Sequence, residues 1–198
     1  AESLESFASD IKKSQPHILF GVPRIWSKCQ EKILESLPQR KLDLLLKMPI
    51  INSIIKKKIK YNLGVRDAVC ILSAAAPISS SLLKWYQTLG ITILQGYGMT
   101  EDCCVSHFNI HKANKVGTVG KTLKNVKAKL SAEGEILIKN NCLMKGYYKS
   151  PDKTAEVLTN DGYLKTGDIG EYDHDGYLSI TGRIKDQFKT DKGKYISP

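Results

Sequence analysis

Two apolar runs separated by a helical segment place the strongest constraint on the fold. Residues 67–77 (DAVCILSAAAP) begin without polar alternation, and residues 91–94 (ITIL) form a second such run. Runs without alternation are typical of strands that are covered on both faces. Serines at 79–81 offer an N-cap for a helix over 82–89, which ends at Gly90. Strand, helix and strand at this spacing predict a βαβ unit, and hence a parallel sheet with helices on its faces.

The N-terminal third of the chain is predicted to be mostly helical. Its apolar residues recur at helical spacing, and prolines separate the segments. Trp26 and Trp85 lie on apolar faces and are expected in the core. The predicted helices cover 2–14, 24–37, 39–48 and 50–61, and one short strand covers 17–23.

The last third carries short strands punctuated by Gly, Asn and Asp, a pattern typical of an antiparallel sheet or a small distorted β-barrel. We therefore predict an α/β protein with a parallel layer and a separate antiparallel part. The predicted barrel strands are 115–121, 126–131, 134–140, 162–168 and 176–182. The predicted subdomains are an α/β part over 1–111 (helical 1–66, βαβ 67–100), a barrel-like part over 112–182, and a hinge with the start of a C-terminal domain over 183–198.

Composition narrows the class of protein. The 198 residues contain no apolar run long enough to span a membrane, and the first residues lack the apolar core of a signal peptide. Five Cys without paired spacing indicate a reducing compartment, so a cytoplasmic location is expected. Cys29, Cys70 and Cys142 are interpreted as small buried hydrophobic residues. His107 and His111 lie four residues apart, but no Cys or carboxylate spacing supports a metal site.

The net charge of +10 is unevenly distributed. Residues 1–66 hold 13 Lys and Arg against 6 Asp and Glu, and residues 112–129 hold six Lys and no acid. Basic surface suits nucleic acid, membrane phosphates or small anions, or serves only solubility. No stacking platform or recognition helix supports nucleic acid. The run KKKIK (56–60) fits either a peripheral contact with the cytoplasmic face of a membrane or the solvated side of a helix.

The strand end QGYGMTE (95–101) carries the most chemistry. Gly96 and Gly98 allow a ligand to approach the backbone, and Tyr97 offers a ring for stacking. Thr100 can donate to a phosphate oxygen, and Glu101 can hold Mg²⁺, which prefers one or two carboxylates plus phosphates. These residues together predict a nucleotide site.

Further segments fit such a site. Ligands of open parallel sheets bind beyond the carboxyl ends of strands, where AAP (75–77) would let a flat ring lie against the backbone. Asp168 lies in the Gly-rich segment GYLKTGDIG, interpreted as a turn between strands, and a carboxylate there can hold ribose hydroxyls. Arg183, in GRIKD after the last strand, suits ribose or phosphate oxygens.

These segments together resemble the adenylate-forming superfamily, and within it the long-chain fatty acyl-CoA synthetase branch. The segments are LSAAAPIS, QGYGMTE, GEILIKN…MKGYYKSP, GYLKTGDIG and GRIKDQFKTDKGKYISP, with VPRIW…KCQEKI near the start. The resemblance covers roughly 16–198. It implies a ligase that uses ATP and Mg²⁺ to form an acyl-adenylate from a fatty acid and then transfers the acyl group to coenzyme A. It also implies the second half of the large N-terminal domain of such enzymes.

The resemblance also implies residue roles. Ala75, Ala76 and Pro77 would border the adenine, on which Tyr97 would stack, with Gln95, Gly96 and Gly98 beside it. Thr100 would contact phosphate and Glu101 would bind Mg²⁺, and these two are the expected catalytic residues. Asp168 and Arg183 would hold the ribose. Lys185 and Asp186 fall where the family has its interdomain hinge.

The family's phosphate loop and its catalytic Lys have no counterpart among these residues. The resemblance therefore implies a partial enzyme that alone forms no acyl-CoA and binds AMP weakly. Two alternatives stay open: a non-catalytic adenylate-binding or scaffold module, and a CoA ligase for another carboxylic acid.

Overall fold

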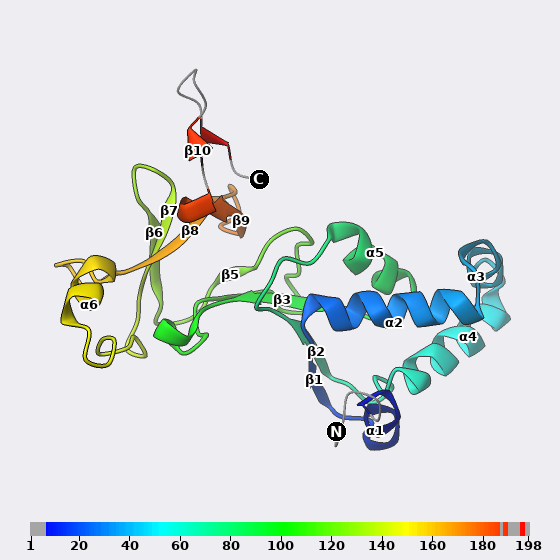
Figure 1. Ribbon diagram of the computed structural model, residues 1–198. Coiled ribbons are helices and arrows are strands. Elements are labelled where there is room, and N and C mark those ends of the chain that lie inside the picture. The colour runs from blue at the N-terminus through cyan, green and yellow to red at the C-terminus, as the bar shows by residue number, and fades with distance from the viewer. Residues whose placement is uncertain (1–6, 187, 190–194, 197–198) are drawn as a thin grey trace. The chain divides into compact units, whose positions relative to one another are not determined.

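Prolines at the first turn of two helices set where those helices begin, because a proline there loses no intrahelical hydrogen bond. Helix α2 spans Pro23–Ser36 and α4 spans Pro49–Asn62, close to the predicted bounds. The computed structural model (Figure 1) describes residues 7–186, 188–189 and 195–196. Within them the first predicted helix is present as α1, Phe7–Ser14. Helix α3, Gln39–Leu46, completes the helical third.

The chain forms two compact units, and the division falls between Leu94 and Gln95. In the N-terminal unit, β1 (Ile18–Phe20) pairs in parallel with β2 (Cys70–Ser73). Helix α5, Ser80–Thr88, follows β2, and the Ser79 hydroxyl accepts a hydrogen bond from the Leu82 N–H at 3.3 Å, as its predicted N-cap role requires. The predicted parallel layer with helices is therefore present.

The core of the N-terminal unit is built around Trp26 and Tyr86. Both are buried, and their rings meet edge to face with centroids 5.8 Å apart. The Trp26 indole N–H donates to the Gly21 carbonyl, and the Tyr86 hydroxyl donates to the Trp26 carbonyl at 2.7 Å. Each polar tip thus has a partner while the ring fills the core. Trp85 is half-buried and donates to Gln39 of α3.

The C-terminal unit contains the predicted antiparallel strands. Its main sheet has four strands in sequence order, and the buried side chains of Ile136, Ile138 and Leu178 form its core. A smaller antiparallel group pairs Gly96 with Phe108 and Tyr97 with His107. The main strands are β6 (Lys127–Leu130), β7 (Glu135–Lys139), β8 (Leu164–Tyr172) and β9 (Leu178–Arg183); the smaller group is β3 (Leu94–Tyr97), β4 (His107–Phe108) and β5 (Lys121–Thr122).

Five short elements complete the described fold. Helix α6 lies between β7 and β8, and two 3₁₀ turns follow β3 and β9. Strands β10 and β11 pair with each other. These elements are α6 (Pro151–Val157), η1 (Thr100–Asp102), η2 (Ile184–Asp186), β10 (Phe188–Lys189) and β11 (Tyr195–Ile196). The predicted subdomain boundaries at 111/112 and 182/183 stay predictions.

Two predicted strands were wrong in position. The strand predicted over 91–94 lies at 94–97, because its antiparallel partner β4 stands opposite Gly96 and Tyr97. Of the strand predicted over 115–121, only Lys121 is in a strand. The Asn109 side chain holds the rest as a loop, since its amide donates to the Thr118 carbonyl and accepts from the Lys115 N–H.

Candidate functional site

Three of the predicted site residues are hydrogen-bonded to one another. The Tyr97 hydroxyl donates to Oδ2 of Asp168 at 2.7 Å, and Nε of Arg183 donates to Oδ1 of the same carboxylate at 2.8 Å. Asp168 and Arg183 are directly opposite each other on β8 and β9, and Tyr97 comes from β3. Asp168 is only 5% exposed, whereas the Arg183 side chain is 67% exposed. We call these residues the Tyr97–Asp168–Arg183 trio.

The environment fixes the protonation states of Tyr97 and Arg183. Burial raises the pKa of Tyr97 well above its usual value, so its hydroxyl keeps its proton and donates. The hydrogen bond to Asp168 raises the pKa of Arg183 further, so the guanidinium stays charged. Tyr97 also packs against the core of the main sheet. The trio is thus a fixed donor–acceptor–donor arrangement, and its stacking role at an adenine stays a prediction.

Asp168 was predicted in a turn between strands, and this was wrong, because it lies inside β8. The glycines around it serve an irregular strand. The register shifts between Ile169 and Gly170, and Gly167 has φ +72°. A Cβ on Gly170 would stand 2.7 Å from the Ser179 carbonyl oxygen. Bulged strands re-aim side chains, which accounts for a carboxylate that points at residues on two other strands.

The Thr100–Glu101 segment forms the 3₁₀ turn η1 directly after β3. Thr100 is exposed and Glu101 is half-buried. The turn is held from outside, since the Glu101 carbonyl accepts from the Met144 N–H at 2.7 Å and its carboxylate accepts from the Tyr147 hydroxyl at 2.9 Å. These partners of Glu101, Met144 and Tyr147, lie outside the Tyr97–Asp168–Arg183 trio.

The packing of the chain itself requires glycine at positions 96 and 98. A Cβ on Gly96 would stand 2.5 Å from the Phe108 ring, and a Cβ on Gly98 would stand 2.6 Å from the backbone of Cys104. The chain returns this closely because Cys103 and Cys104 both adopt left-handed conformations, with φ 56° and 57°. The prediction that these glycines admit a ligand stays untested, and the packing of β4 and of the loop after η1 already requires them.

The remaining predicted residues are spread over the chain. Ala75, Ala76 and Pro77 are exposed after β2, and Ala75 has φ 72°. The Gln95 side-chain oxygen is buried and lacks a hydrogen-bond partner among the residues that the structure describes. Such an orphan acceptor is costly and fits a ligand donor. Lys185 and Asp186 are exposed in η2.

Among the cysteines, the structure corrects the predicted burial of Cys142. Cys142 was predicted to be buried but is exposed, and its carbonyl accepts from the Cys103 thiol at 3.3 Å. Cys29 is half-buried, and burial raises the pKa of its thiol, which suits a small hydrophobic residue. Across residues 7–186, no group of three or more His, Cys, Asp or Glu is arranged to hold a metal ion. A Mg²⁺ held by Glu101 would therefore need phosphate oxygens as further ligands.

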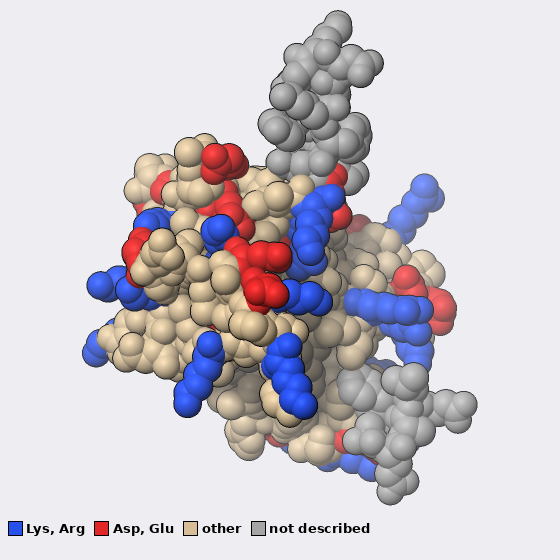
Figure 2. Space-filling model, turned by 60° about the vertical axis from the view of Figure 1, so that its left-hand side comes forward, with Lys and Arg blue, Asp and Glu red and all other residues tan. Residues whose placement is uncertain are grey.

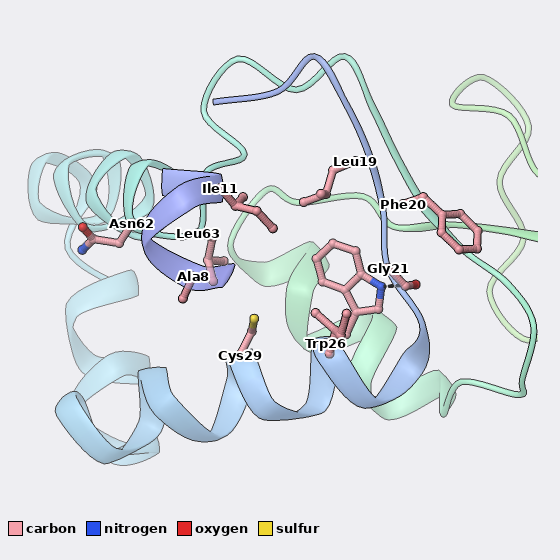
Figure 3. A pocket seen from close by; sticks show the side chains of 10 residues that line it. Ala8, Ile11, Leu19, Phe20, Gly21, Trp26, Cys29, Asn62 and Leu63 are labelled. Carbon is pink, nitrogen blue, oxygen red and sulfur yellow. Dashed lines mark hydrogen bonds between the residues drawn. The ribbon is translucent and has the colours of Figure 1, made fainter. Parts of the chain in front are cut away.

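A small apolar cavity of about 60 Å³ lies in the N-terminal unit, and none of the residues that line it is a predicted site residue. Figure 3 shows Ala8 and Ile11 of α1, Leu19 of β1, and Trp26 and Cys29 of α2 around it.

Sequence reasoning missed the contacts by which four residues shape the site. Tyr147 binds Glu101 from 46 positions away, and no local spacing announces that contact. Asp102 is fully buried, and its carboxylate accepts a hydrogen bond from the Met99 N–H at the start of η1. The sequence offered a signal for this contact, because an acid lies three residues after Met99, whose own side chain cannot cap the turn. His107 and Tyr172 bond each other next to Tyr97. Pairing across strands, which local patterns do not report, creates that contact.

Comparison with known proteins identifies the class to which this fold and site belong. The family model described as "AMP-binding enzyme" matches residues 2–148, so the chain belongs to the family of AMP-binding enzymes. The acyl-CoA ligases among its relatives include long chain acyl-CoA synthetase 3 of Arabidopsis thaliana, 37% identical over 164 residues that cover 75% of this chain and 24% of that protein. Long-chain-fatty-acid–CoA ligase ACSBG2 of Xenopus laevis is 30% identical, covering 98% of this chain and 30% of that protein.

A solved structure of an ATP-bound RpMatB-BxBclM chimera is also similar. It has a TM-score of 0.73 and 25% identity, covering 96% of this chain and 36% of the chimera. The predicted resemblance to adenylate-forming enzymes is thus confirmed at the level of the family and the fold. The chain spans about a quarter to a third of the length of the curated relatives it matches.

Proposed function

We propose that this chain forms the adenosine-binding part of an AMP-forming fatty-acid–CoA ligase. The observation that carries the proposal is the Tyr97–Asp168–Arg183 trio. An ionised carboxylate has about four lone-pair directions. Tyr97 and Arg183 use two of them and leave about two for the hydroxyls of a ribose. The Arg183 guanidinium has five N–H groups, only one of which is spent on Asp168, and its exposure leaves the others open to oxygens of a nucleotide.

The other roles are proposed from the resemblance to AMP-binding enzymes. Tyr97 would orient the base, with the orphan oxygen of Gln95 as an acceptor. Thr100 would donate to a phosphate oxygen. The Tyr147 hydroxyl occupies one oxygen of Glu101, and the second would bind Mg²⁺, which neutralises phosphate charge when bound. The Met144 N–H would keep η1 in place during these contacts.

The reaction proposed for the whole protein proceeds in two transfers. A fatty-acid carboxylate attacks the α-phosphorus of ATP, which forms an acyl-adenylate and releases pyrophosphate. The thiol of coenzyme A then attacks the acyl carbon, and AMP leaves. A free carboxylate is a poor electrophile, whereas AMP is a good leaving group. The long-chain acid is proposed because two relatives described above are named for long-chain substrates.

The proposal is tested with a nucleotide that lacks the contacts assigned to Asp168. AMP and 2′,3′-dideoxy-AMP are titrated into the chain by calorimetry or NMR. We expect AMP to bind about tenfold or more tightly than the dideoxy compound, because hydrogen bonds to a charged group contribute about 1.5–3 kcal/mol. Asp168→Asn removes the charge with little change in shape and should abolish this preference.

The matched control is Glu171→Gln, an exposed acid three residues further along β8. It should leave the preference for AMP unchanged, and circular dichroism checks that both variants are folded. Equal binding of the two nucleotides by the unaltered chain would contradict the ribose assignment. So would an Asp168→Asn variant that still prefers AMP.

A further inference from the structure

Helices α3 and α4 carry exposed apolar side chains that the fold does not use. Figure 1 shows α3 and the beginning of α4 beyond the C-terminal end of α2, at the end of the N-terminal unit that is remote from β1 and β2. Leu44 is 63% exposed, Ile50 79% and Ile54 58%. Together with the exposed Met48 and neighbouring bases they form what we call the α3–α4 apex: Arg40, Lys41, Leu44, Lys47, Met48, Ile50, Ile54, Lys57 and Lys58.

The period of α4 explains why some isoleucines face outward. Side chains four residues apart share a face of a helix. Ile51, Ile55 and Ile59 form the inward face, and they are half-buried or buried. Ile50, Ile54 and Lys58 form an adjacent face, about 100° around the helix from the first, and are exposed. Helix α4 therefore has apolar residues on two faces, of which only one serves the core.

The exposure at the apex is concentrated. Single exposed apolar residues are ordinary on protein surfaces. Here four large apolar side chains are exposed within the eleven residues from 44 to 54. The turn between α3 and α4 is firmly built, because the Asn52 amide donates to the Leu46 carbonyl at 2.8 Å and the Asn52 N–H donates to the Met48 carbonyl. The apex is thus a structured apolar surface, which marks an interaction site.

Charge indicates what the apex contacts. Residues 37–61 contain seven Lys and Arg and a single acid, Asp43. The Asp43 carboxylate accepts a hydrogen bond from the Gln39 amide at 2.6 Å, and α4 itself has no acid. Apolar side chains next to lysines on short helices are typical of segments that lie in the interface of an anionic membrane. No described helix has the length and apolar character needed to cross a bilayer.

We propose that the α3–α4 apex docks on the surface of a bilayer that contains anionic phospholipids. Leu44, Met48, Ile50 and Ile54 enter the headgroup region, and the flanking bases contact lipid phosphates and carboxylates. The exposed apolar side chains argue against a nucleic-acid site, because a nucleic-acid backbone offers isoleucines nothing apolar to contact. Docking needs no nucleotide, so its failure would leave the proposed ligase function untouched.

Flotation with lipid vesicles tests the proposal. The chain is mixed with vesicles of phosphatidylcholine alone or with 30% phosphatidylserine, at low and at physiological salt. We expect binding to the anionic vesicles, and weaker binding to neutral ones and at higher salt. Lys57→Gln with Lys58→Gln should lower the partition coefficient about 30-fold at low salt. Ile50→Gln with Ile54→Gln should lower it about fivefold or more, also at high salt.

Two controls match these variants. Tyr148→Gln removes an apolar side chain that is 85% exposed in the C-terminal unit, and Lys124→Gln with Lys127→Gln removes two exposed lysines there. Both should bind vesicles as the unaltered chain does. The proposal is overturned if the unaltered chain does not float, or if the controls lose as much binding as the apex variants. It is also overturned if the Ile50/Ile54 variant alters only self-association in sedimentation velocity, or if binding to duplex DNA is the sole property lost with Lys57 and Lys58.

Discussion

His107 is a buried histidine whose two ring nitrogens both have partners. Nδ1 lies 2.6 Å from the Ser106 hydroxyl, and Nε2 lies 2.7 Å from the Tyr172 hydroxyl and 3.2 Å from that of Thr122. Burial lowers the pKa of His107 to about 4. A neutral imidazole, which donates at one nitrogen and accepts at the other, fits this set of hydroxyls. The His107 ring is therefore a neutral, fully hydrogen-bonded group that packs beside Tyr97.

The first prediction concerns stability between pH 6.5 and pH 4. Since the folded pKa of His107 lies below its unfolded value of about 6.5, the unfolded chain binds the proton more readily. Stability is then full above pH 6.5 and is lost as the pH falls toward 4, by about 2 kcal/mol at pH 5. Urea denaturation at pH 7 and pH 5 measures the loss.

His107→Gln should be less stable than the unaltered chain at pH 7 but should lose less stability at pH 5. The control, His17→Gln, replaces an exposed histidine and should follow the unaltered chain. An unchanged pH dependence in His107→Gln would show that other groups cause the acid sensitivity.

At the scale of elements, the segment between β3 and η1 shows that close backbone packing can require a glycine at a given position. The second prediction is that Gly98→Ala destabilises the chain by about 3 kcal/mol, because its Cβ would collide with the Cys104 backbone at 2.6 Å and a backbone cannot rotate away. Gly176→Ala, with φ +80° and open space, should cost only about 1 kcal/mol of conformational strain. Denaturant midpoints compare the two variants, and an equal or smaller loss in Gly98→Ala would refute the argument.

Elements were predictable where local chemistry decides them. Pro23, Pro49 and the Ser79 cap gave helix starts within a residue or two of those observed. Strands were less predictable, because their limits depend on a partner that is distant in sequence. Ile91 and Ile93 are buried as expected, yet β3 begins at Leu94, since the hydrogen-bonding partner lies opposite Gly96 and Tyr97.

The candidate site likewise has parts that the local sequence predicts and parts that depend on distant partners. Sequence motifs selected Tyr97, Asp168 and Arg183, and the structure brings them within hydrogen-bonding distance. The strand setting of Asp168 was not predictable, because its bulge arises from pairing with both β7 and β9. The contact between Tyr147 and Glu101 depends on how the segment after β7 returns to η1, which no periodicity encodes.

At the scale of the whole molecule, net charge acts on stability. The chain carries +10 at pH 7 and has a sequence pI near 9.3. On the face displayed in Figure 2, basic and acidic side chains are interspersed, so repulsion there is partly offset. Self-repulsion of an uncompensated net charge weakens the compact state, and salt screens it.

The third prediction is therefore that raising NaCl from 20 to 200 mM at pH 7 increases the melting temperature by about 2 °C. Near pH 9.3, where the net charge approaches zero, the same change should have almost no effect. Differential scanning calorimetry measures both shifts. A melting temperature that falls with salt at pH 7 would mean that attractive ion pairs, such as Lys115 with Asp173, outweigh repulsion.

The placement of the two tryptophans has a practical consequence for spectroscopy. Trp26 and Trp85 are the chain's only indoles, and both belong to the N-terminal unit. Light at 295 nm therefore excites that unit alone, whereas Tyr97 and its partners are silent at this wavelength. A tryptophan introduced at Tyr148, which is 85% exposed, would give the C-terminal unit an emission of its own and allow the two halves to be followed separately in one cuvette.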